Sequence, residues 1–106
     1  MPTSDPTLKD LQRSVDAWIE ENGGYWDEMS LMCRLTEEVG ELAREYNHRF
    51  GAKTKKSTEA ESTIDGEMAD VLWLVLCMAN QQGIDLNKAL KDVFTKLKVR
   101  DADRWT

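Results

Sequence analysis

The chain has 106 residues, a net charge of −6 and a pI near 4.8. This length suits one domain, and the 41% hydrophobic and 32% charged residues are typical of a soluble globular protein. The acidic balance argues against a broad nucleic-acid or anionic-membrane surface, and no apolar run reaches the ~20 residues of a membrane helix. We therefore expect a cytoplasmic protein that binds neither nucleic acid nor membrane.

A polar stretch, residues 1–6, precedes the first predicted helix, and we expect it to be a flexible tail. The domain itself is expected to span residues 7–106. Thr7 is a good N-cap, and the sequence Asn22-Gly23-Gly24 predicts the end of the helix. Apolar residues recur at helical spacing between these limits, with Trp18 expected in the core: Leu8, Leu11, Val15, Trp18 and Ile19.

A second helix is predicted from about Asp27 to Arg49, followed by Gly51 as its stop. Its apolar residues alternate at spacings of three and four, which indicates the seam of a helical bundle: Met32, Leu35, Val39, Leu42 and Tyr46. The segment that follows, residues 52–57, contains three lysines and is expected to be a basic loop.

The third helix is predicted to start at a capping box formed by Thr58 and Glu61, or at Ser62, and to continue to Gln82. It is apolar on nearly every side between residues 71 and 79, and we expect Trp73 to be core. Such a helix must be covered on most of its surface, and a chain of this size supplies few neighbours. This pattern predicts that another subunit covers part of it.

A fourth helix is predicted after Asp85, with one apolar face: Leu86, Ala89, Leu90, Val93, Phe94 and Leu97. No long period-two pattern indicates a strand, so the predicted fold class is all-α. Cys33 and Cys77 are far apart and lie in apolar helical runs, so we expect two buried free thiols in a reducing compartment.

Two carboxylate motifs interrupt the most apolar helices, and they read Glu37-Glu38-Val39-Gly40-Glu41 and Glu67-Met68-Ala69-Asp70. Residues three apart share one helix face, so each motif presents a pair of carboxylates in one direction. Two such helices side by side would bring four carboxylates into one small volume. Carboxylates held against a core need a cation.

Carboxylate ligands without His or Cys favour a hard cation, Mg²⁺ or alternatively Mn²⁺. Such an ion suits the hydrolysis of phosphate esters or phosphoanhydrides by an activated water. Glu37 lies about 100° around the helix from Glu38. It is therefore expected to hold or deprotonate the attacking water from beside the metal site rather than to ligate the ion.

The same two motifs on successive helices resemble the all-α nucleoside triphosphate pyrophosphohydrolases, a group that contains MazG, the dimeric dUTPases and phosphoribosyl-ATP pyrophosphohydrolase. The local sequences at residues 35–42 and 67–72 are close to the MazG form, and the resemblance extends from about residue 8 to residue 104. It implies a four-helix MazG-like bundle completed by oligomerisation as a homodimer or homotetramer.

The resemblance also implies an activity and roles for the motif residues. The reaction would cleave a nucleoside triphosphate at the α–β anhydride to give the monophosphate and pyrophosphate, with the removal of unwanted nucleotides as its purpose. By motif position, Glu37 would be the catalytic residue that positions water. The Mg²⁺ ligands would be Glu38, Glu41, Glu67 and Asp70.

Residues outside the motifs are candidates for holding the substrate. Lys96 and Arg100 are one helical turn apart and suit the phosphate tail, although cations at a helix C-terminus also interact favourably with its dipole. His48 and Trp26, together with Tyr25, are candidates for stacking on the nucleobase. Packing at a helix end is the alternative explanation for these three side chains.

Two other classes of protein are consistent with parts of the sequence. Glu45-x-x-His48 is one half of a di-iron carboxylate motif, but that site needs a second histidine and the chain has only one. A non-catalytic helical oligomerisation or regulatory module with a vestigial metal site is the second alternative. Metal-dependent release of pyrophosphate distinguishes the enzyme from this module.

Overall fold

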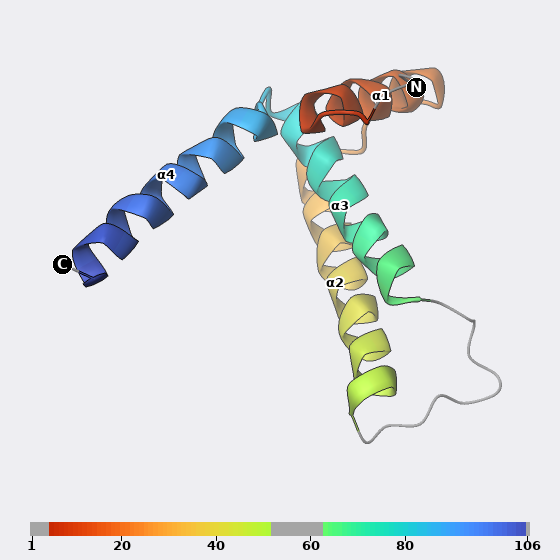
Figure 1. Ribbon diagram of the computed structural model, residues 1–106. Coiled ribbons are helices and arrows are strands. Elements are labelled where there is room, and N and C mark those ends of the chain that lie inside the picture. Colours follow the sequence, from red (N-terminus) through yellow and green to blue (C-terminus); the bar gives the residue numbers. More distant parts are fainter. Residues whose placement is uncertain (1–4, 52–62, 106) are drawn as a thin grey trace.

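The computed structural model describes residues 5–51 and 63–105, with side chains as far as residue 101. The described residues form four α-helices and no strand, which confirms the all-α prediction (Figure 1). The helices are α1 (Leu8–Glu21), α2 (Glu28–Phe50), α3 (Ile64–Gln81) and α4 (Leu86–Trp105). None of the helices in the described part of the chain combines the length and apolar character needed to cross a membrane.

Side-chain caps set the starts of the first two helices where they are predicted. The Asp10 amide donates to the Thr7 hydroxyl at 3.1 Å, and the Thr7 amide donates to the Asp10 carboxylate at 2.9 Å. This reciprocal pair satisfies two backbone donors that the first helical turn leaves without partners. Asp27 caps α2 by accepting from the Ser30 amide at 2.9 Å, and Gly51 ends that helix.

The start of α3 differs from the prediction. Its N-cap is Thr63, whose hydroxyl accepts from the Gly66 amide at 3.1 Å. The predicted caps Thr58 and Ser62, and the predicted basic loop, lie outside the described residues. Ser and Thr are both good N-caps, so the local sequence alone could not choose among Thr58, Ser62 and Thr63. At α4, Asp85 accepts from the Lys88 amide at 3.3 Å, as its predicted capping role requires.

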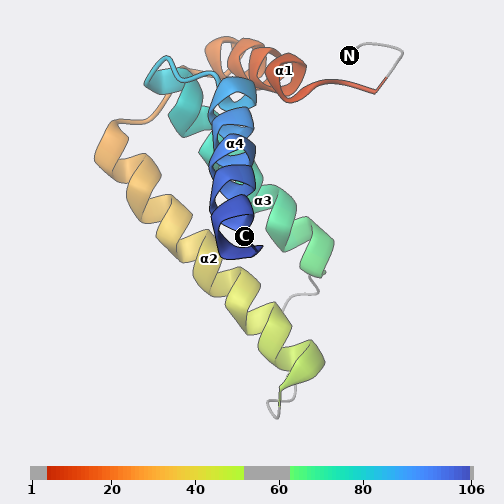
Figure 2. The ribbon, with the colours of Figure 1, turned by 60° about the vertical axis from the view of Figure 1, so that its left-hand side comes forward.

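The helices α2 and α3 run antiparallel and pack along each other, and α1 lies across the end of this pair where α3 finishes (Figures 1 and 2). The buried core forms where these three helices meet: Val15, Leu31, Leu74, Leu76 and Cys77. In contrast, α4 projects away from the α2–α3 pair and makes its main contacts with α1. Within one chain, the predicted four-helix bundle is therefore three packed helices and one extended arm.

The predicted seam of α2 is only partly covered within the chain: Leu35 packs against the core and Leu42 is half-buried. Leu31, Glu38 and Glu45 are buried, whereas the apolar stripe one position further along is exposed: Met32 at 45%, Val39 at 48% and Tyr46 at 42%. Because α2 has only one long helical neighbour in its own chain, one face must remain uncovered. The periodicity correctly identified an apolar stripe, but it did not predict that Met32, Val39 and Tyr46 lie outside the contact with the other helices.

Three other predictions of burial are wrong for the single chain. Trp18 and Trp73 are exposed, and they contact each other edge to face with 5.5 Å between ring centroids. Cys33 is also exposed, and of the two thiols only that of Cys77 is buried. The spacing of apolar residues does not show how many other helices contact a helix. The sequence therefore predicted more buried side chains than a single chain contains.

Candidate active site

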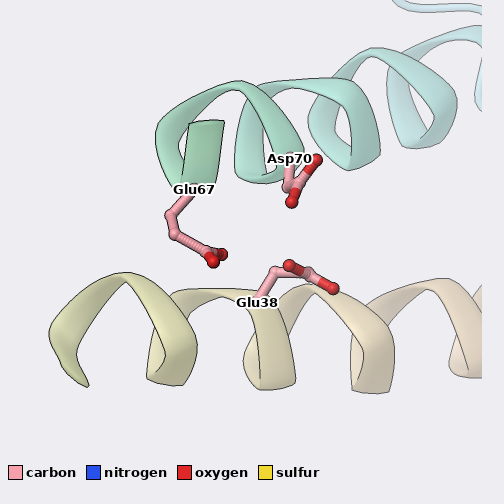
Figure 3. Close-up of side chains that lie close together, drawn as sticks. All are labelled: Glu38, Glu67 and Asp70. Carbon is pink, nitrogen blue, oxygen red and sulfur yellow. The ribbon is translucent and has the colours of Figure 1, made fainter. Parts of the chain in front are cut away.

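Three carboxylates converge between α2 and α3. Glu38 extends from α2, and Glu67 and Asp70 extend toward it from the first two turns of α3 (Figure 3). One oxygen from each side chain lies within 4.8 Å of the others. The three-residue spacing places Glu67 and Asp70 on one face of α3, and the antiparallel packing sets that face against Glu38. The structure thus brings the two sequence motifs together.

The fourth predicted ligand, Glu41, is not part of this group. It follows Glu38 by one turn on α2 and is half-buried, but its oxygens lie outside the 4.8 Å cluster. Its charge still acts on the site, because it contributes to raising the pKa of Glu38. Spacing on a helix predicts a shared face but not the rotamer of a long side chain, so Glu41 as a ligand remains a prediction.

Burial and charge make the cluster costly without a cation. Glu38 is only 4% exposed, and burial raises its pKa, an effect that Glu41, Asp70 and Glu67 reinforce and Arg34 opposes. The Oε2 atoms of Glu38 and Glu67 are buried with no hydrogen-bond partner among the described residues. Buried carboxylate oxygens require a compensating donor or metal, and an all-oxygen set fits a hard divalent ion.

The predicted catalytic residue Glu37 lies beside the cluster rather than in it. Its carboxylate accepts a hydrogen bond from Nη1 of Arg34 at 3.0 Å, and the same guanidinium reaches Glu38 through Nη2 at 2.6 Å. Sequence analysis overlooked Arg34. Its position three and four residues before the two glutamates was a usable signal, because residues at that spacing are neighbours on a helix surface.

A cavity of about 420 Å³ adjoins the carboxylates. Glu38, Asp70 and Arg34 form its polar part, and aromatic side chains form much of the rest: Trp18, Tyr25, Trp26 and Trp73. Trp26 and Tyr25 therefore line the same cavity as Glu38 and Asp70, and their stacking on a base remains a prediction. Tyr25 is held by a 2.6 Å hydrogen bond from its hydroxyl to Asp16, and burial together with this bond raises its pKa to about 12.

The remaining substrate-binding candidates lie elsewhere. His48 has a side chain only 5% exposed, 3.9 Å from Glu45, and it is not among the residues that line the cavity, so its stacking on a base remains a prediction without support from this cavity. Lys96 and Arg100 are exposed on α4, the helix that projects away from α2 and α3. They cannot hold a phosphate at the carboxylates of their own chain. The sequence could not predict the direction of α4, which is why it suggested these two residues as phosphate ligands within one chain.

The di-iron alternative also receives no support from the arrangement. Glu45 and His48 are neighbours, but among the described residues the group able to hold a metal consists of carboxylates alone.

The comparisons with known proteins all point to the same family. The protein YpjD of Bacillus subtilis (strain 168), which is uncharacterized, is 48% identical over 104 residues, or 97% of this chain and 94% of YpjD. A crystal structure of Bacillus subtilis YPJD, described as a candidate pyrophosphatase, has a TM-score of 0.83 at 43% identity and covers 92% of this chain and 99% of that one.

A second crystal structure is that of the Bacillus-conserved MazG protein, a nucleotide pyrophosphohydrolase. Its TM-score is 0.76 at 43% identity, and the match covers 90% of this chain and 93% of that one. A model of the MazG nucleotide pyrophosphohydrolase domain matches residues 27–105, a range that includes both carboxylate motifs. The chain therefore belongs to the MazG family of nucleotide pyrophosphohydrolases.

Proposed function

We propose that this protein hydrolyses a nucleoside triphosphate between its α- and β-phosphates and releases the monophosphate and pyrophosphate. The observation that carries the proposal is the convergence of Glu38, Glu67 and Asp70 within 4.8 Å beside an aromatic cavity, in a chain of this family. The cellular role that we assign is the removal of unwanted nucleotides in the cytoplasm.

The carboxylates would hold Mg²⁺, or Mn²⁺ in its place, with Glu41 as a fourth ligand. When bound, the ion supplies charge neutralisation at the phosphates and an activated water. Glu37 is adjacent to Glu38 and bonded to Arg34, which supports a role in which its carboxylate would accept a proton from the attacking water. Burial of Glu38 and Glu67 supports this assignment, because their unpartnered oxygens require a cation.

The aromatic side chains of the cavity would bind the nucleobase. Stacking of a base on an aromatic side chain contributes about 1–3 kcal/mol and tolerates different bases. Trp26 is exposed and lines the cavity that Glu38 and Asp70 share, so one nucleotide can contact both parts. This arrangement supports a nucleotide with its phosphates at the carboxylates and its base among the tryptophans.

The active assembly that we propose is a homodimer or homotetramer. Exposed apolar side chains follow the outer face of α2 and continue on α4, including Val39, Tyr46 and Phe94. Two copies would cover these faces and could supply the missing neighbours of α2. We retain Lys96 and Arg100 as phosphate ligands only within such an assembly, because α4 carries them away from their own chain's carboxylates.

The decisive experiment is a panel of canonical and modified nucleoside triphosphates with Mg²⁺, with products separated by chromatography. We expect monophosphate and pyrophosphate, and no products after addition of EDTA. Asp70→Asn should lower kcat by about 10³-fold or more, since it removes a charged metal ligand. Asp65→Asn is the matched control, because Asp65 is an exposed carboxylate on the same helix, outside the cluster.

Other outcomes would overturn the proposal in different ways. Diphosphate and orthophosphate as products would mean that a different bond is cleaved. Equal activity of the Asp70→Asn and Asp65→Asn proteins would place the reaction elsewhere. Absence of turnover on every nucleotide would favour the non-catalytic oligomerisation module with a vestigial metal site.

A further inference from the structure

Arg34 joins the proposed catalytic residue to a proposed metal ligand. Its Nη1 lies 3.0 Å from Oε2 of Glu37, and its Nη2 lies 2.6 Å from Oε1 of Glu38. A guanidinium is planar and presents its donors in a fixed fork, so it can hold two carboxylates in a defined relation. Arg34 also lines the cavity that Glu38 and Asp70 line, and its contact with Glu38 puts its positive charge next to the proposed metal site.

The contact with Arg34 engages one of the two oxygens of the Glu38 carboxylate. Oε1 is bound by Arg34, whereas Oε2 is buried and has no hydrogen-bond partner among the described residues. A cation that uses Oε2 therefore meets a ligand whose other oxygen is already occupied. The guanidinium repels a divalent ion, and this repulsion opposes metal binding at the neighbouring carboxylates.

The contact with Glu37 restrains a side chain that little else restrains. The Glu37 side chain is 63% exposed, and its bond to Arg34 is the hydrogen bond that the structure shows for its carboxylate. An exposed glutamate otherwise samples several rotamers. With Arg34 in place, the Glu37 carboxylate is fixed relative to Glu38 and hence to the metal that Glu38 would bind.

We infer that Arg34 is a positioning residue that weakens metal binding while aligning Glu37 with the metal site. This inference rests on the proposed function. It predicts an unusual pair of effects: loss of the guanidinium tightens metal binding and slows turnover. A residue with a purely structural role would weaken both, and a ligand of the substrate phosphates would mainly raise KM.

The test measures Mn²⁺ binding without nucleotide by isothermal titration calorimetry at pH 8, and steady-state kinetics, on the full chain. In Arg34→Gln we expect Kd for Mn²⁺ to fall at least about tenfold, because the repulsion between one unit charge and a divalent ion is lost at a partly buried site. We expect kcat to fall about 10- to 100-fold with KM for the nucleotide within about twofold, because alignment is lost and substrate contacts remain.

Two further variants separate the charge of Arg34 from its shape. Arg34→Lys keeps the charge but cannot bridge two carboxylates, so Kd for Mn²⁺ should stay within about twofold of wild type while kcat remains low. Arg44→Gln removes an exposed arginine from the same helix and should change neither quantity. Thermal unfolding of every variant checks that the fold is retained.

Each failure has a distinct meaning. Unchanged or weaker Mn²⁺ binding by a folded Arg34→Gln protein overturns the inference, as does full turnover by Arg34→Lys. A large rise in KM in Arg34→Gln would overturn it in favour of a phosphate ligand. If the wild-type protein itself binds no Mn²⁺ and releases no pyrophosphate, the proposed function fails rather than the role of Arg34.

Discussion

At the scale of single residues, Glu38 combines burial with negative charge. It is 4% exposed and is surrounded by Glu41, Asp70 and Glu67, with Arg34 as its compensating cation. Burial and the neighbouring carboxylates outweigh that cation, so the pKa of Glu38 is raised above the ordinary value of 4.5. Folding therefore favours the protonated form of Glu38, and the ionised form carries a cost in stability.

The sign of this effect predicts how stability depends on pH in the presence of EDTA. Because the folded protein binds this proton more tightly than the unfolded chain, Glu38 destabilises the fold at pH values above its raised pKa. Glu38→Gln should therefore raise Tm at pH 7, and the gain should shrink as pH falls through the raised pKa toward 4.5. Thermal unfolding followed by circular dichroism measures both trends.

The control for this prediction is Glu20→Gln, which removes an exposed carboxylate from α1 and should leave Tm nearly unchanged. A gain in Tm that is equally large for both variants would indicate relief of the net charge of the chain. Lower stability of Glu38→Gln at pH 7 would mean that the bond to Arg34 outweighs the cost of burial.

At the scale of elements, Gln12 connects α1 to the junction of α3 and α4. Its Nε2 donates to the Ile84 carbonyl at 2.8 Å and to Asn80 Oδ1 at 3.2 Å, and its Oε1 accepts from the Leu86 amide at 2.9 Å. Asn80 returns a bond to the Gln12 carbonyl at 2.9 Å. These bonds tie the first residue of α4 to α1, and so help to set the direction in which α4 projects.

Gln12→Ala should lower the free energy of unfolding by about 2–3 kcal/mol, because the buried Gln12 side chain makes three part-buried hydrogen bonds at the junction that are then lost. Urea denaturation measures this change. Gln82→Ala, at an exposed glutamine at the end of α3, should cost less than about 0.5 kcal/mol. Equal costs for the two variants would show that the Gln12 bonds contribute no more than an ordinary surface residue.

At the scale of the whole molecule, the single chain is less compact than its length predicts. Its radius of gyration is 17.4 Å, whereas about 13 Å is expected for a compact domain of this length. Its accessible surface is 8179 Å², against roughly 6,100 Å² for a monomeric protein of this mass. For two chains the excess is roughly 4,000 Å² in total, which lies in the range of about 2,000–5,000 Å² that obligate homodimers bury. This comparison supports the proposed self-association.

The wild-type mass in solution should be two or four times the chain mass of 12.2 kDa, as measured by size-exclusion chromatography with light scattering. Phe94→Glu places a charge on the exposed apolar face of α4 and should shift the protein toward the monomer. Thr95→Glu adds the same single charge at an exposed residue of α4 about 100° around the helix from Phe94, and it should leave the mass unchanged. A wild-type mass of 12.2 kDa at every concentration would contradict self-association.

The sequence was sufficient to predict features that depend on interactions between residues close together in the chain. Thr7 and Asp27 predicted helix starts because a side-chain acceptor before a helical run satisfies free amides. The spacing of Glu67 and Asp70 predicted a shared face because a helix repeats every 3.6 residues. By contrast, the cap of α3 lay among several equivalent Ser and Thr residues, and only the folded chain selects Thr63.

The sequence by itself determined the helical class, three of the four helix starts and the two carboxylate motifs that indicate the family. Only the tertiary structure decided which face of α2 meets α3, so that Glu38 is buried while Val39 is exposed. It also decided that α4 projects outward and that Arg34 bridges Glu37 and Glu38. Periodicity and capping depend on residues within one helix. The buried face of α2, the direction of α4 and the contacts of Arg34 depend on packing between helices or on side-chain rotamers, which a local sequence pattern does not predict.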